Sequence, residues 1–116
     1  MPFRARQSSL PLTPISFEIL LALLDEDRHG YAILQVVEAR LGAVLPLRTG
    51  TIYRALARLM EEGLIAEAAA APAIDERRRT YRITAEGRKI ARAEAERLAD
   101  QVAAARAHRL LPGQRK

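Results

Sequence analysis

Apolar residues recur at helical spacing in the first third of the chain. From Pro14 to about Leu24 they cover most of the helix circumference, and Thr13 followed by Pro14 is typical of a helix start. A second run, from about Tyr31 to Leu41, has its apolar positions on one face, and Gly42 follows where that helix would end. The pattern predicts two helices joined by a short turn.

A third amphipathic stretch predicts a helix from Thr49, acting as N-cap, to Gly63. Ile52, Leu56 and Leu59 recur on one side of it, and we expect that side to face inward.

Alternation of apolar and polar residues predicts two short strands, at 64–67 and 80–83. The connection between them, residues 68–79, is too long for a tight turn. Thr84 is then placed as the N-cap of a final helix that can continue to about Leu110.

The predicted elements follow the order of a winged helix-turn-helix: helix, turn, helix, helix, hairpin, helix. The expected fold class is mostly α with a small β-hairpin wing, that is, α+β, and 116 residues suffice for one such domain. We expect a flexible basic arm at 1–12, the winged helix-turn-helix head at 13–83, a C-terminal helix at 84–111 and a basic tail at 112–116.

The final helix has a heptad seam of small and apolar residues, spaced four, three, four and three. Its members are Ala91, Ala95, Leu98, Val102 and Ala105. Such a seam favours close helix–helix packing, and a helix of roughly 40 Å would extend past a small head. We therefore expect this helix to form the dimer interface with a second copy of the chain.

Charge is unevenly distributed. The chain carries 19 basic and 14 acidic residues, a net charge of +5, and basic residues dominate from Arg77 to Arg92. This balance suits a polyanionic partner without proving one. There is no cysteine, which excludes a disulfide framework and favours an intracellular, cytoplasmic location, and no apolar run is long enough to cross a bilayer.

Three motifs in order make a more specific pattern: His29-Gly30-Tyr31, then GTIYRALARLMEEGLI, then TYRITAEG. Over roughly Leu12–Lys89 the chain resembles the PadR family of bacterial transcription regulators. The resemblance implies a homodimer that binds double-stranded DNA at inverted-repeat operators as a repressor, often released by a small effector.

Carried over by position, the resemblance implies a set of DNA-binding residues on the third helix. They are Thr49, Thr51, Tyr53, Arg54 and Arg58. Arg54 and Arg58, one turn apart, are expected to point outward together, and either can contact guanine or phosphate. For Tyr53, packing beneath the wing is the alternative to DNA contact.

The wing arginines Arg77, Arg78 and Arg79 are expected to bind phosphate or enter the minor groove. The alternative is a flexible charged loop without fixed contacts, which would still attract DNA non-specifically. The alanine-rich residues 68–73 depart from the wings expected in this family, so a wing-derived sequence preference does not follow.

His29 lies near three acidic residues, which raises a metal or catalytic reading. No second histidine lies at helical spacing, so we expect no metal site, no cofactor and no enzyme activity. The interpretation favoured instead is that His29 and Tyr31 pack and cap the second helix, with Gly30 in a turn that needs an unusual backbone angle. A winged-helix module that binds an acidic protein remains the alternative to a DNA-binding regulator.

Overall fold

The computed structural model describes residues 11–45, 47–68 and 78–112. Outside this part lie most of the predicted arm, residues 69–77 of the predicted connection, which include Arg77, and the end of the tail. The elements in chain order are α2 (Pro14–Asp25), β1 (Arg28–His29), α3 (Gly30–Leu41), α4 (Thr49–Glu61), β2 (Ile65–Glu67), β3 (Thr80–Ile83) and α5 (Ala85–Ala107).

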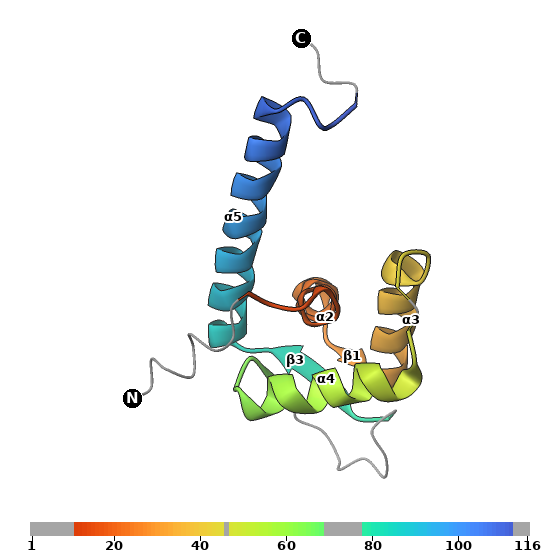
Figure 1. Cartoon of the computed structure of the whole chain (residues 1–116). Helices are drawn as coiled ribbons and strands as arrows, with labels where there is room; N and C mark the ends of the chain where they lie inside the picture. The colour runs from red at the N-terminus through yellow and green to blue at the C-terminus, as the bar shows by residue number, and fades with distance from the viewer. Residues whose placement is uncertain (1–10, 46, 69–77, 113–116) are drawn as a thin grey trace.

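Helix α2 is the centre of the core, surrounded by α3, α4 and α5 (Figure 1). Ile19, Leu20 and Leu23 are at most 2% exposed, as expected for a helix that is apolar on most sides. Thr13 caps it as predicted, accepting a hydrogen bond from the Ser16 N–H at 3.1 Å.

A three-stranded antiparallel sheet, in the order β1-β3-β2, closes one side of the helices. The hairpin β2–β3 was predicted, and Tyr81 and Ile83 are buried while Arg82 is exposed, as the alternation indicates. Strand β1 was not predicted, because residues 27–30 were expected to form only a turn. Two residues carry no periodicity, and β1 exists because the edge of β3 offers partners, with Arg28 opposite Tyr81.

The helix termini required two corrections. Thr49 is the first residue of α4 rather than its N-cap, which is Arg48 with no side-chain hydrogen bond. Gly30 is the first residue of α3 and does not have the unusual backbone angle that was expected of it. Among the described glycines, the positive φ belongs to Gly63, at 77°. Gly63 and Leu64 donate to the Met60 and Leu59 carbonyls, which is a Schellman end to α4.

Helix α5 starts as predicted: Thr84 Oγ1 accepts from the Gly87 N–H at 3.0 Å. It ends at Ala107, three residues earlier than the pattern suggests. Arg109, two residues beyond that end, adopts φ of 60°. Its first half packs on α2, and its second half extends away from the head (Figure 1). Within the described residues, no helix is both long and apolar enough to cross a membrane.

The folded head begins before Thr13, which corrects the predicted arm boundary. Leu12 is 9% exposed and belongs to the core, and its N–H donates to Glu94 of α5 at 3.4 Å. Glu94 is 2% exposed and accepts from Arg97 Nη2 at 2.6 Å. The Arg97 guanidinium holds the pKa of Glu94 below its usual value, against the opposing effect of burial, and the Leu12 N–H adds to the lowering.

Candidate nucleic-acid interface

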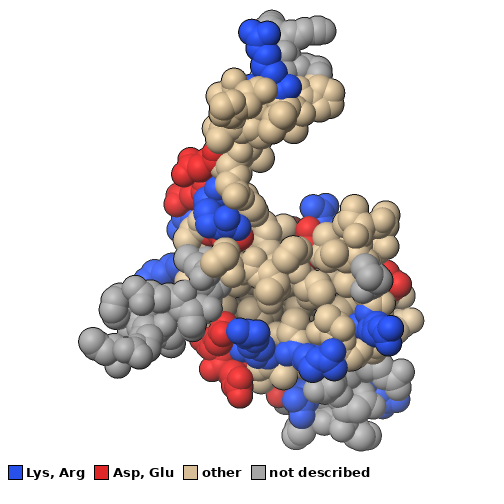
Figure 2. Space-filling model, viewed as in Figure 1, with Lys and Arg blue, Asp and Glu red and all other residues tan. Residues whose placement is uncertain are grey.

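Helix α4 has a buried side and a charged side. Ile52, Leu56 and Leu59 are each 1% exposed, which confirms the predicted inward face. Thr49, Arg54 and Arg58 are exposed. Figure 2 shows basic side chains along the visible face of α4 and acidic ones toward its C-terminal end.

Arg54 lies in the first half of α4, on the exposed side. Its Nη2 donates to Thr51 Oγ1, one turn earlier, at 3.4 Å. The Gly50 position is also close, because a side chain there would meet the Arg54 guanidinium at 3.3 Å. Arg54 and Thr51 are therefore presented together at the start of the helix, within reach of a ligand that approaches this end.

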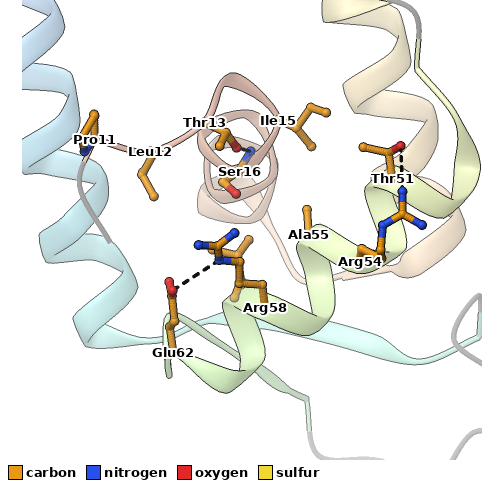
Figure 3. Close-up of a pocket in the computed structure, with 11 residues that line it drawn as sticks. Pro11, Leu12, Thr13, Ile15, Ser16, Thr51, Arg54, Ala55, Arg58 and Glu62 are labelled. Carbon is orange, nitrogen blue, oxygen red and sulfur yellow. Dashed lines mark hydrogen bonds and ion pairs between the residues drawn. The ribbon is translucent and has the colours of Figure 1, made fainter. Parts of the chain in front are cut away.

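Arg58 is exposed like Arg54 but has different surroundings. Its Nε lies 3.5 Å from Glu62 Oε2, and the Arg58 side chain is 67% exposed. It borders a groove between α4 and the start of α2 (Figure 3). The two arginines do lie outward, as expected, yet only Arg58 points toward the first turn of α2 (Figure 3).

Tyr53 is partly buried and packs against the hydrophobic core. Of the two roles left open for it, packing is therefore observed. DNA contact through its exposed part stays a prediction.

The two described wing arginines border two different hollows at the base of the hairpin. Arg79 borders a hollow with Ala57 and Glu61 of α4. Arg78 borders another hollow with His29 and Tyr31, near the start of α3. Arg77 lies outside the described residues. The base of the wing thus presents one arginine beside α4 and one beside α3.

His29 joins β1 to the returning strand of the wing. Its Nδ1 lies 3.0 Å from Thr80 Oγ1 and 3.1 Å from the Arg78 carbonyl oxygen. His29 is the N-cap residue of α3, as predicted, but its side chain makes no cap hydrogen bond to that helix. Tyr31 is 51% exposed rather than packed, since the first turn of α3 lies at the surface beside β1. In the part of the chain that the structure describes, no three histidines or acids are grouped to hold a metal ion.

The predicted seam of α5 divides between head and free helix. Ala91 is 4% exposed in the head's own core, beside Ile90. Leu98 and Ala105 are partly buried, whereas Ala95 is exposed and Val102 is 43% exposed. The seam beyond Ala91 is thus the part that a second chain can reach.

Thr13, Ser16 and Glu62 border the same groove as Arg58, and sequence reasoning assigned none of them to this surface. Thr13 was recognised only as a helix cap. The start of α2 and the end of α4 are far apart in the chain, so no local pattern could bring them together.

Comparisons with known proteins agree with this geometry. The family model described as the transcriptional regulator PadR-like family matches residues 19–93. A transcriptional regulator from Clostridium thermocellum is similar in structure: 32% identity, 76% of this chain and 84% of that chain covered, TM-score 0.59. RosR from H. salinarum is 27% identical, with 82% and 78% covered and a TM-score of 0.61.

A more distant likeness concerns the fold alone. Bacillus subtilis PadR, solved in complex with operator DNA, is 22% identical with a TM-score of 0.58. The match covers 91% of this chain but 53% of that chain, so this chain spans about half of that protein. No curated protein sequence matches this chain.

Proposed function

Because this chain belongs to the PadR-like family of transcriptional regulators, we propose that it is a homodimeric repressor that binds inverted-repeat operators in double-stranded DNA. It acts in the cytoplasm and without enzyme activity, in keeping with that role. The family resemblance also implies that a small effector releases the protein from DNA. A ligand screen on the purified protein tests this.

The observation that carries the proposal is the exposed, basic side of α4 with an arginine of the wing beside it. Arg54 and Thr51 at the start of α4 suit the edges of bases in a major groove. The same fold is seen bound to operator DNA in Bacillus subtilis PadR. Thr49 lies at the uncapped start of α4, where hydroxyl and backbone N–H groups favour a phosphate.

The exposed part of the seam on α5 supports a symmetric dimer in which two α5 helices would pair. A twofold arrangement would place two α4 helices on one face of the duplex, about 34 Å or one turn apart. An operator with two inverted half-sites follows from that symmetry.

Binding-site selection from random duplexes tests the proposal, because it reports DNA binding, symmetry and half-site spacing together. We expect enrichment of an inverted repeat, with affinity that falls steeply as salt rises. Enrichment of no repeat, together with unchanged binding in the Arg54→Ala/Arg58→Ala protein, would contradict it. A shallow salt dependence with an acidic protein as the preferred ligand would favour the protein-binding alternative.

A further inference from the structure

A groove lies between the start of α2 and the exposed side of α4, beside the surface that suits base edges. It encloses about 360 Å³. Near the end of α4 its walls combine hydroxyl groups of Thr13 and Ser16 with Arg58 and Glu62 (Figure 3). Thr51 and Arg54 border it farther toward the start of α4. We call it the α2–α4 groove.

The groove offers hydrogen-bond donors to an anion. Thr13 Oγ1 already accepts from the Ser16 N–H at 3.1 Å, so the hydroxyl proton of Thr13 is available to donate. The Arg58 guanidinium points from α4 toward the same first turn of α2 (Figure 3). A group that carries negative charge and several acceptor oxygens matches these donors.

The pairing of Arg58 is loose enough to be exchanged. Its Nε lies 3.5 Å from Glu62 Oε2, and the Arg58 side chain is 67% exposed. The Glu62 side chain is 20% exposed, but at this distance and with the guanidinium in water the ion pair contributes little free energy. Glu62 can therefore hold Arg58 in the free protein and yield it to a stronger anion.

Arg54 is placed differently, although it lies on the same side of α4. It also borders the groove, but it is hydrogen-bonded to Thr51 in the first half of the helix, away from the end that carries Glu62 (Figure 3). The end of α4 that approaches bases in helix-turn-helix proteins is the N-terminal one. Arg54 is thus suited to a base edge in the major groove. Arg58 is suited to the sugar–phosphate backbone that borders the major groove.

We propose that the α2–α4 groove holds one phosphate of the DNA backbone, with Arg58 as its cation, Thr13 as a hydroxyl donor and Glu62 as an internal competitor for Arg58. The inference rests on the proposed function, since it assigns part of the same DNA surface. Duplex DNA is the occupant because the groove is continuous with the exposed side of α4, and its donors match a phosphodiester.

The experiment compares point variants on two duplexes: the one recovered by selection and one of random sequence. Arg58→Ala should weaken both equally, and should lower the slope of log affinity against log salt by about 0.9 per protomer. Arg58→Lys should restore the slope, because a phosphate contact needs charge more than a planar fork. Arg54→Ala should instead relax the preference at one base position.

Glu62→Gln is the sharper variant, because it removes the competitor without touching a donor. We expect affinity for both duplexes to rise about two- to five-fold, the range of a surface ion pair released. Glu61→Gln, the same charge change at the exposed neighbour outside the groove, is the matched control, and Arg92→Ala on α5 is the control for loss of an arginine. Circular dichroism of each variant checks folding.

Three results would overturn the inference. One is that Arg58→Ala changes the base preference of the protein and that Arg58→Lys does not restore it. Another is equal affinity of Glu62→Gln and Glu61→Gln for DNA. The third is saturable binding of benzoate by the free protein that Arg58→Ala abolishes and that duplex DNA does not displace, which would make the groove a small-anion site. If the wild type binds no duplex at all, the proposed function itself fails and the groove assignment fails with it.

Discussion

Two glycines act at the residue scale, for different physical reasons. Gly63 ends α4 with φ of 77°, and a Cβ built there meets no atom within 4 Å. Gly87, in the first turn of α5, has no such backbone requirement. A Cβ there would lie 2.1 Å from the Leu64 carbonyl oxygen and 2.8 Å from a side-chain carbon of Ile83. The first position needs a left-handed backbone, and the second needs the absence of a side chain.

The two positions therefore differ in their expected cost on substitution by alanine. Gly63→Ala should lower the free energy of unfolding by about 1–2 kcal/mol, the cost of a left-handed L-residue. Gly87→Ala should cost about 3 kcal/mol or more, because a backbone carbonyl cannot move aside as a side chain can. Thermal unfolding measures both, at about 4 °C per kcal/mol for a domain of this size. Equal melting temperatures for the two variants would show that α5 is not held this closely against Leu64.

Glu94 gives stability at the residue scale that depends on pH. Its pKa is lowered in the folded protein, so its contribution is present in full above the unfolded value of about 4.3 and is lost as pH falls through the folded pKa. Glu94→Gln should cost about 1–3 kcal/mol at pH 7, since it weakens charged hydrogen bonds with Arg97 and Leu12.

Denaturant unfolding from pH 7 to about pH 3 tests this assignment. We expect the difference in free energy of unfolding between wild type and Glu94→Gln to disappear as pH falls below about 4.3. Glu96→Gln, at an exposed position two residues on, should show no gap at any pH. A gap for Glu94→Gln that is constant over the whole range would mean that the ionised carboxylate is not the stabilising form.

At the scale of elements, periodicity and caps in the sequence predicted the four described helices and the hairpin. Thr13 and Thr84 cap α2 and α5 through their own side chains, a local signal that can be read from the chain alone. Strand β1 and the burial of Glu94 could not be predicted, because each depends on a partner far along the chain. His29 pairs with Thr80 and Leu12 with Glu94, and no local spacing encodes such contacts.

The candidate site was predictable to a similar extent. Helical periodicity sufficed to place Arg54 and Arg58 on the exposed side of α4. It could not show that Arg58 borders α2, nor that Arg78 and Arg79 border two different hollows at the wing base. Those neighbours are set by tertiary packing between segments that are distant in sequence.

The wing is the element whose charge can be tested as a unit. Arg78→Ala/Arg79→Ala should weaken binding to every duplex alike and lower the salt slope by about 0.9 for each phosphate that is no longer neutralised. Affinities on selected and random duplexes between about 50 and 200 mM salt measure this effect. Arg92→Ala/Arg106→Ala, which removes the same charge from exposed positions of α5, should leave the slope unchanged. A changed base preference in the wing variant would instead assign it a role in sequence reading.

At the scale of the whole molecule, α5 is longer than its own head can cover. With 23 residues it extends about 35 Å, and its buried residues lie in the first three turns, ending at Glu94. Much of the visible surface between the free half of α5 and the head is uncharged (Figure 2). Val102, 43% exposed on this free half, lies on the predicted seam. A partner helix against the seam would cover it.

The seam assignment predicts that a charge at its centre breaks the dimer. Leu98→Glu and Val102→Glu should each give a monomer in sedimentation, because pairing would bury a carboxylate without a partner. Ala103→Glu, exposed and one position off the seam, should remain dimeric. Val102 lies beyond the head, so its variant separates loss of pairing from loss of folding. With two half-sites no longer linked, affinity for an inverted repeat should fall toward that for a single half-site. If both seam variants sediment as dimers, the protomers pair through another surface.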